Sequence, residues 1–274
     1  MPFIQTPNIR LHYLDIGAKH LPILLLMHGL TANAHAFGGL VKAGLSEHFR
    51  IISPDLRGRG QTEQPDSGYT LADHAEDIMA LLEQLAIKKL AVLGGHSFGG
   101  FLAIYLSVQY PEIAQKLLIL DCASPMPAET SQRLLPALSR LGKQFDTREQ
   151  YFETMRGATY LDFWDEAMQS YYEADIAHNE GFGYTPIPQI AQMTKAVQGI
   201  LAENFDNYLQ AIKLPVVLVF AEGIYTQQSP LIPQEYALAT VQKIKNAQHF
   251  TVQGNHQTML YGESARVIVN YLKN

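Results

Sequence analysis

The sequence predicts an α/β fold in which a mostly parallel sheet is covered by helices on both faces and interrupted by one helical insertion. Two observations predict it. Short apolar runs of strand length alternate with longer amphipathic stretches, as in doubly wound α/β proteins. One long segment, residues 124–212, departs from this alternation and contains no run typical of a strand.

The expected strands are continuous runs rich in Val, Ile and Leu, bounded by Gly, Pro or Asp. Runs of this kind are typical of parallel strands that are buried on both faces of a sheet. They occupy Ile23–Met27, Arg50–Ser53, Leu90–Gly94, Lys116–Asp121, Val216–Ala221 and Phe250–Val252.

Helical patterns fill the stretches between these runs. Leu71–Leu85 and Gly262–Leu272 carry apolar residues at helical spacing, and Phe101–Tyr110 follows directly after a pair of glycines. Each of these stretches adjoins an expected strand, so we expect them to cover the sheet.

The segment 124–212 is rich in aromatic residues and in residues that favour helices. We interpret it as a helical lid, with residues 1–123 and 213–274 together forming the core domain. The aromatic residues could instead form only the internal core of the insertion. They are Phe145, Tyr151, Phe152, Tyr160, Phe163, Trp164, Tyr171, Tyr172, Phe182 and Tyr184.

Composition limits the partners and the location of the chain. Its 274 residues carry a formal net charge of −6 and no cluster of Lys and Arg, which disfavours nucleic acid as a partner. No apolar run approaches the length of about 20 residues that a membrane-spanning helix needs. Cys122 is the only cysteine, and the N-terminus lacks the pattern of a signal peptide, so we expect a cytoplasmic protein.

The strongest chemical signal is the sequence Gly95-His96-Ser97-Phe98-Gly99, which lies between an expected strand and an expected helix. This context is the one that a G-x-S-x-G nucleophile elbow requires, because a sharp strand-to-helix turn projects the serine hydroxyl from the edge of the sheet. The alternative is a glycine-rich turn with a capping serine. The context favours Ser97 as a nucleophile.

An oxyanion formed at such a serine needs at least two fixed N–H donors. The sequence His28-Gly29-Leu30 follows the strand Ile23–Met27 and could supply one of them. The candidate donors are the backbone N–H groups of Leu30 and Phe98. By itself, His28-Gly29 would be an ordinary turn at the end of a strand.

Four stretches together resemble the α/β-hydrolase superfamily along nearly the whole chain. They are MHGL (27–30), SPDLRGRGQT (53–62), GGHSFGG (94–100) and QGNHQTML (253–260). The resemblance implies an α/β-hydrolase fold with a mostly parallel eight-stranded sheet, helices on both faces and a helical lid. It also implies that Asp55 belongs to a structural loop and is not catalytic.

A serine hydroxyl becomes nucleophilic when a neutral imidazole takes its proton. In the family that this chain resembles, the base comes last in the sequence, on the loop after the final strand, and His256 fits that position. His249 is the competitor, but it falls at the start of a strand. His96 belongs to the elbow, and His74 lies in a predicted helix.

The third member of the triad departs from the usual pattern, because Ile224 occupies the position at which most relatives carry an Asp. Asp121, at the end of the strand Lys116–Asp121, is our preferred acid, since some relatives draw the acid from this strand. Glu222 is the second candidate. A dyad without an acid, or an inactive protein, also stays open.

A serine nucleophile suits acyl transfer, so we expect a hydrolase of carboxylic esters, thioesters or lactones of a small to medium apolar substrate. In the superfamily that this chain resembles, epoxide hydrolases and dehalogenases use an Asp at the elbow, and Ser97 argues against both of these activities. The alternatives are a carbon–carbon bond hydrolase or lyase, and a ligand-binding relative with little turnover.

No metal or dinucleotide motif is present in the sequence, so we expect no cofactor. The expected partner is a small-molecule substrate, with neither nucleic acid nor membrane, and a homo-oligomer stays open. We also expect short-chain esters to be preferred over long ones, because a lid should enclose the pocket.

Overall fold

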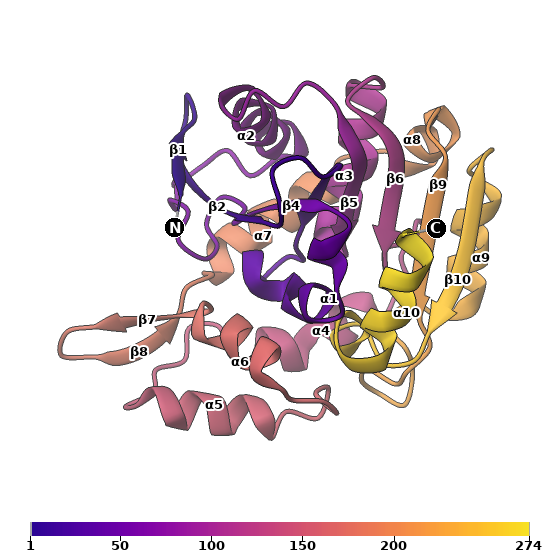
Figure 1. The fold of residues 1–274 in the computed structure, drawn as a ribbon. Helices are drawn as coiled ribbons and strands as arrows, with labels where there is room; N and C mark the ends of the chain where they lie inside the picture. Colours follow the sequence, from indigo (N-terminus) through magenta and orange to yellow (C-terminus); the bar gives the residue numbers. More distant parts are fainter. Residues whose placement is uncertain (1, 274) are drawn as a thin grey trace.

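The computed structural model describes residues 2–273 and contains an eight-stranded sheet with the order β1-β2-β4-β3-β5-β6-β9-β10 (Figure 1). The pairs β1·β2 and β2·β4 are antiparallel, and all other neighbours are parallel. The strands are β1 (Phe3–Gln5), β2 (Arg10–Ile16), β3 (Ile23–Met27), β4 (Arg50–Pro54), β5 (Leu90–His96), β6 (Ala114–Leu120), β9 (Val216–Ala221) and β10 (Ala247–Val252).

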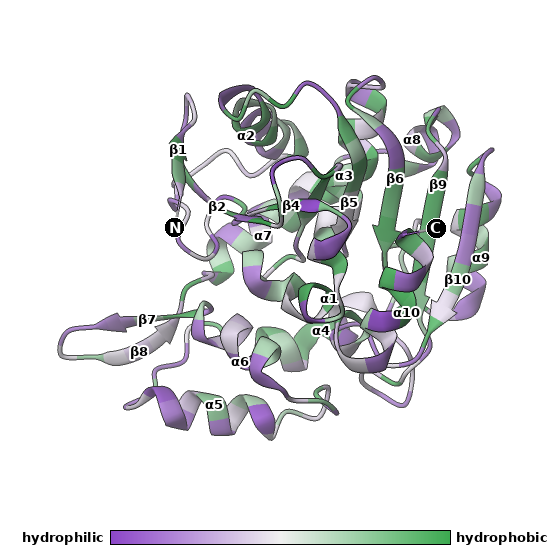
Figure 2. Cartoon of the chain, in the orientation of Figure 1, coloured by the Kyte–Doolittle hydropathy of each residue, from purple (hydrophilic) through white to green (hydrophobic). Residues whose placement is uncertain are grey.

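The central strands are largely apolar because both of their faces are buried over most of their length. Figure 2 shows β9 and the C-terminal half of β6 as hydrophobic. All six residues of β9 are buried, and alternate side chains of this strand point into the two hydrophobic cores. This pattern is the one that predicted the strand from the sequence.

Helices cover both faces of the sheet. α2, α3, α8 and α9 contribute to one core, whereas α1, α10 and the aromatic residues of α5 and α6 contribute to the other. The helices are α1 (Gly38–Lys42), α2 (Leu71–Gln84), α3 (Phe98–Gln109), α4 (Thr130–Leu138), α5 (Arg148–Arg156), α6 (Glu166–Glu173), α7 (Ile190–Leu201), α8 (Phe205–Ala211), α9 (Gln234–Gln242) and α10 (Gly262–Leu272). Three short 3-10 helices are Ala34–Phe37, Leu45–Glu47 and Thr258–Leu260.

The mostly parallel eight-stranded sheet with helices on both faces confirms the predicted fold class. β3, β9 and α10 begin and end at the residues expected from the sequence. β5 and β6 differ from their expected ranges by a few residues at their ends. β1 and β2 are not among the runs expected from the sequence, because these antiparallel strands contain polar residues and are only partly buried.

The segment 124–212 lies between β6 and β9 and contains α4 to α8. The expectation that it holds no strands is wrong, because β7 (Ile176–Asn179) and β8 (Gly183–Pro186) form an antiparallel hairpin that projects from the molecule (Figure 1). The hairpin is short, mostly polar and only partly buried, so it lacks the continuous apolar run that predicts the other strands.

The C-terminal part of this segment packs into the core of the sheet domain. Ala196 and Ile200 of α7 and Phe205 and Leu209 of α8 share one hydrophobic core with α2 and α3. Before α7, helices α5 and α6 contribute buried residues to the other core of the sheet, so both halves of the segment pack against the sheet. The division into a core and a functional lid stays a prediction.

Among residues 2–273, none of the helices has the length and apolar character that crossing a membrane requires.

Candidate active site

Ser97 lies in the tight turn between β5 and α3. Its backbone has φ 54° and ψ −116°, a region that side-chain-bearing residues rarely adopt and that costs of order 1–3 kcal/mol. The turn can close because Gly95 has no Cβ: a Cβ at this position would lie 2.0 Å from the Gly99 carbonyl oxygen. A Cβ on Gly99 would lie equally close to the carbonyl oxygen of Met27. Glycine is therefore required on both sides of the serine.

The ends of the neighbouring strands bring the predicted residues together. His96 and Leu120 are paired as the last residues of β5 and β6, so Ser97 and Asp121 follow at the same edge of the sheet. The Ser97 N–H donates to the Leu120 carbonyl oxygen at 2.9 Å. His256 reaches this edge from the loop after β10.

Asp121 contacts His256 directly. Asp121 Oδ2 lies 2.6 Å from His256 Nδ1, and both side chains are buried. Asp121 Oδ1 accepts a hydrogen bond from the Ala221 N–H at 2.9 Å, which fixes the carboxylate plane. Asp121 has φ 46°, so it is a second residue of this edge in the left-handed region. This is the hydrogen-bond geometry that the acid role requires, and the role itself stays a prediction.

The other candidate positions lie away from this contact. Glu222 is exposed, and its Oε1 accepts a hydrogen bond from Thr251. Ile224, at the usual position of the acid, is 62% exposed. The competing histidine His249 is exposed on β10. Of these candidates, Asp121 is the one found on His256.

Asn255 holds the loop that carries His256. Its Nδ2 donates to the carbonyl oxygens of Tyr160 at 3.0 Å and of Ile224 at 3.2 Å. Its Oδ1 accepts from the N–H groups of Gln257 and Thr258. The amide is 1% exposed, and it joins three segments that are remote in sequence.

The predicted oxyanion donors occupy suitable backbone positions. Phe98 is the first residue of α3, where N–H groups have no partner within the helix. His28 Nε2 accepts from the Leu56 N–H at 2.9 Å, so Nδ1 carries the proton and donates to the Gly29 carbonyl oxygen at 2.8 Å. Because a trans peptide is planar, this contact directs the Leu30 N–H to the opposite side.

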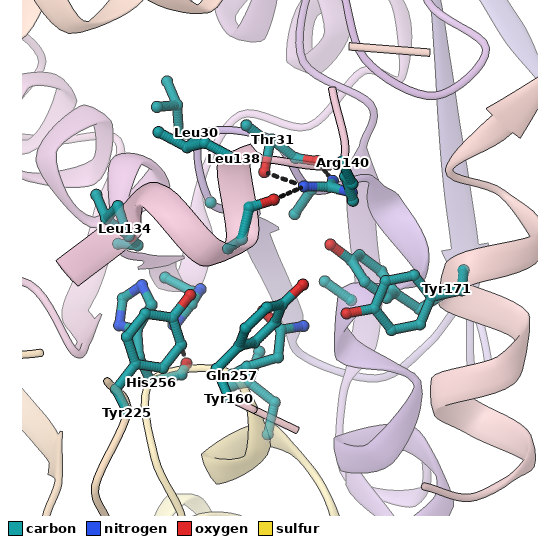
Figure 3. Close-up of a pocket in the computed structure, with 18 residues that line it drawn as sticks. Leu30, Thr31, Leu134, Leu138, Arg140, Tyr160, Tyr171, Tyr225, His256 and Gln257 are labelled. Carbon is teal, nitrogen blue, oxygen red and sulfur yellow. Dashed lines mark hydrogen bonds between the residues drawn. The ribbon is translucent and has the colours of Figure 1, made fainter. Parts of the chain in front are cut away.

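A pocket opens over Ser97 and His256. The volume of this pocket that the centre of a water molecule can occupy is about 60 Å³. Figure 3 shows Tyr160, Tyr225 and His256 together on one side of the pocket, and Thr31 and Arg140 on another. Burial raises the pKa of each tyrosine that lines the pocket, so all of them are neutral hydrogen-bonding groups near pH 7. These tyrosines are Tyr160, Tyr171, Tyr172 and Tyr225.

Sequence reasoning missed several residues of this pocket, among them the polar residues Arg140, Tyr225 and Gln257. Gln257 adjoins the predicted base, and Tyr225 follows Ile224 and lies edge-on to the His256 ring at 5.5 Å between centroids. Their closeness to predicted positions was a usable signal. Arg140 gave none, because a lone Arg in a predicted helical segment is typical of a solvated surface.

Asp55 has the structural role that the resemblance implied. Its carboxylate accepts hydrogen bonds from the N–H groups of Ala34 at 2.6 Å and Gln61 at 2.9 Å, and it contacts His12 Nδ1 at 2.7 Å. Burial opposes ionisation, but the bond from His12 and its neighbours keep the pKa of Asp55 below its usual value. This carboxylate anchors the loop after β4.

The buried histidines around the site predict a loss of stability in acid. Burial lowers the pKa of His74 and His96, and that of His28 from 6.5 to about 4. Below pH 6.5 the unfolded chain binds protons that the folded chain does not, so the free energy of unfolding should fall between about pH 6.5 and pH 4. His28 alone should account for up to about 3 kcal/mol.

Urea unfolding at about pH 7 and about pH 5 would measure this loss. In His28→Gln, which has no titrating group at this position, the dependence on pH should be shallower. A free energy of unfolding that stays constant between the two pH values would contradict the prediction.

Among residues 2–273, no group of three or more His, Cys, Asp or Glu side chains is arranged to hold a metal ion. The expectation that the chain uses no cofactor stays a prediction.

Comparison with known proteins places this geometry in a family. A family model described as the alpha/beta hydrolase fold matches residues 22–263. The 2-(acetamidomethylene)succinate hydrolase of Mesorhizobium japonicum is 28% identical over 208 residues, which cover 74% of this chain and 71% of that protein. A soluble epoxide hydrolase of a Corynebacterium species is 31% identical over 136 residues, 50% of this chain and 42% of that protein.

Solved structures agree with this fold. The crystal structure of E-2-(acetamidomethylene)succinate hydrolase has a TM-score of 0.85 and 22% identity, covering 100% of this chain and 98% of that chain. A thioesterase domain from the curacin biosynthetic pathway has a TM-score of 0.78 and 18% identity, with the same coverage. At these identities the likeness shows the fold alone. Since the family model covers most of its length, the chain belongs to the α/β-hydrolase fold family.

Proposed function

We propose that the chain hydrolyses carboxylic esters with a small acyl group that carries no charge, through an acyl-enzyme on Ser97. His256 takes the serine proton and later delivers it to the leaving alcohol. Asp121 orients the imidazole and stabilises its protonated form. The N–H groups of Leu30 and Phe98 bind the oxyanion of the tetrahedral intermediate.

One observation carries the proposal. A strained elbow serine and a histidine line the same pocket, and the histidine bears a buried carboxylate 2.6 Å from Nδ1. With Nδ1–H donating to Asp121, the Nε2 atom of His256 is left as the basic nitrogen. The sequence had kept a silent ligand-binding relative open because Ile224 replaces the usual acid. The contact of Asp121 with His256 supports an active enzyme instead.

The charge of the pocket favours an uncharged substrate. The relative from Mesorhizobium japonicum is named for a succinate derivative, which is a dicarboxylate. Among the lining residues of this chain, the permanently cationic side chain is Arg140, and all five of its N–H bonds are directed at protein acceptors. No donor of Arg140 is left for a substrate carboxylate. The tyrosines offer neutral hydrogen bonds instead.

The size of the pocket favours a short acyl chain. A water molecule needs about 10–15 Å³ of such space, so the 60 Å³ over Ser97 suits a group of a few heavy atoms. Leu134, Leu138 and Leu260 supply apolar walls for that group. Thioesters and lactones of similar size meet the same requirements.

A panel of p-nitrophenyl esters tests this proposal. We expect kcat/KM to be higher for the acetyl and butyryl esters than for the palmitoyl ester. We also expect the butyryl ester to exceed the mono-succinyl ester, which matches it in length but carries a charge. A fluorophosphonate probe should label Ser97 in the same preparation.

Faster turnover of the palmitoyl ester would contradict the enclosed pocket, and faster turnover of the succinyl ester would contradict the uncharged substrate. A protein that the probe labels but that turns over no ester would favour the carbon–carbon bond hydrolase that the sequence left open. A Ser97 inert to the probe would favour the ligand-binding alternative.

A further inference from the structure

The turn 29–32, which carries the proposed oxyanion donor Leu30, is held at successive carbonyl groups. The Ala32 N–H closes the turn on the Gly29 carbonyl oxygen at 3.2 Å, and His28 Nδ1 donates to the same oxygen. Arg59 Nε donates to the Leu30 carbonyl oxygen at 2.8 Å. Both of these side-chain donors belong to the sheet domain.

The third carbonyl of the turn is held from the segment 124–212. Arg140, which follows α4, donates from Nη2 to the Thr31 carbonyl oxygen at 2.8 Å and from Nη1 to Thr31 Oγ1 at 3.2 Å (Figure 3). A further bond from Nη1 reaches the Ala137 carbonyl oxygen at 2.8 Å. Arg140 is therefore the side chain that connects the C-terminal end of α4 to the turn by hydrogen bonds.

The guanidinium is itself fixed within the segment. Arg140 Nε and Nη2 form a bidentate pair with the Asp175 carboxylate, at 2.8 and 3.0 Å, and the side chains are 3% and 1% exposed. The Tyr151 hydroxyl donates to the same carboxylate. One rigid cluster thus joins α4, α5 and the junction between α6 and β7 to the turn beside Ser97.

We propose that Arg140 is a positioning residue that makes the oxyanion hole dependent on the packed state of the segment 124–212. The inference rests on the proposed function, because it takes the Leu30 N–H as an oxyanion donor. When the guanidinium is in place, the Thr31 carbonyl is satisfied and the turn has one arrangement. When it is absent, the Thr31 carbonyl loses its partner and the turn keeps only the hydrogen bonds at Gly29 and Leu30, so the Leu30 N–H is held less rigidly.

Two readings of Arg140 predict different kinetics. A residue that positions the oxyanion hole acts in the transition state, so its loss lowers kcat and leaves KM nearly unchanged. A residue that binds the substrate would raise KM. The saturation of all five N–H bonds by protein acceptors favours the first reading.

The test uses two variants and one matched control in the full chain. Arg140→Met/Asp175→Leu removes both members of the buried pair, so that no charge is left unpaired. Arg140→Lys keeps a charge for Asp175 but lacks the planar fork that reaches Thr31. The control is Arg133→Met: Arg133 lies on α4, the helix that precedes Arg140, and donates to the carbonyl oxygen of Pro230, away from the turn.

For both Arg140 variants we expect kcat for p-nitrophenyl butyrate to fall by about 10- to 100-fold, with KM within about twofold of the wild type. The inhibition constant of butylboronic acid, which forms a tetrahedral adduct on the serine, should rise by a similar factor. Arg133→Met should leave kcat and this inhibition constant unchanged. Circular dichroism checks that each variant is folded.

The proposal is overturned when folded Arg140→Lys keeps the wild-type kcat, when KM alone rises, or when Arg133→Met loses as much activity as the Arg140 variants. The last result would mean a general loosening of α4. These outcomes all require an active wild type. A wild-type chain that neither turns over esters nor binds the boronic acid would contradict the proposed function, and the role of Arg140 with it.

Discussion

Ser97→Ala is expected to lower kcat for p-nitrophenyl butyrate by at least about 10⁴-fold. Alanine lacks the hydroxyl that forms the acyl-enzyme, while Leu30, Phe98 and the pocket are unchanged. The residual rate should therefore be the small one that an oxyanion hole gives to attack by water. Steady-state kinetics on the purified variant, together with loss of labelling by a fluorophosphonate, would measure the effect.

The stability of the variant separates chemistry from unfolding. Ser97→Ala keeps a Cβ at φ 54° and should unfold close to the wild type, whereas Ser97→Gly relieves the strain and should be at least as stable as Ser97→Ala. Both variants should be inactive. A folded Ser97→Ala chain that retains more than a few per cent of the activity would rule out Ser97 as the nucleophile.

The central part of the fold could be predicted because its pattern is local. A strand buried on both faces must be apolar at every position, and β9 satisfies this condition within six residues. α10 presents a regular apolar stripe to the sheet, with Ile268 and Val269 buried. Neither pattern depends on knowing what the element packs against.

The outer strands could not be found in this way. β2 is buried over only three of its seven residues, and within residues 2–273 β7 and β8 pair only with each other and with Phe145. Which side chains of these strands are buried depends on the element that each strand pairs with, and that partner is known only from the folded structure. Predicting a short polar strand therefore requires the position of its partner, and the periodicity of the sequence does not give that position.

The residues of the candidate site also differ in whether the sequence alone could identify them. Ser97 lies in a local motif: Gly95 is required by a contact within the turn, and Gly99 by a contact with Met27 at the end of β3. The motif itself is short enough to recognise in the sequence. His256 and Asp121 needed the order of the strands, which the resemblance supplied. Arg140 could not be found, because its role depends on Asp175, which is 35 residues away in sequence, and on Thr31, which is 109 residues away.

Asp121→Asn is expected to lower kcat by up to about 10⁴-fold, with little change in KM. Asn can keep the hydrogen bond from the Ala221 N–H to Oδ1, and Asn tolerates the left-handed backbone at φ 46° about as well as Asp. Its Nδ2 group would then donate to His256 Nδ1. The imidazole would carry its proton on Nε2, where it cannot accept the proton of Ser97. The histidine would also lack a negative partner for its protonated form.

Glu222→Gln is the matched control, since it removes one carboxylate that directly follows the neighbouring strand β9, with the same change of charge. Glu222 is exposed and bonded to Thr251, so its loss should leave kcat within about twofold of the wild type. If Glu222→Gln lost the activity and Asp121→Asn kept it, the usual strand would supply the acid after all. If both variants kept full activity, His256 would act without an acid, and the 2.6 Å contact with Asp121 would serve the fold alone.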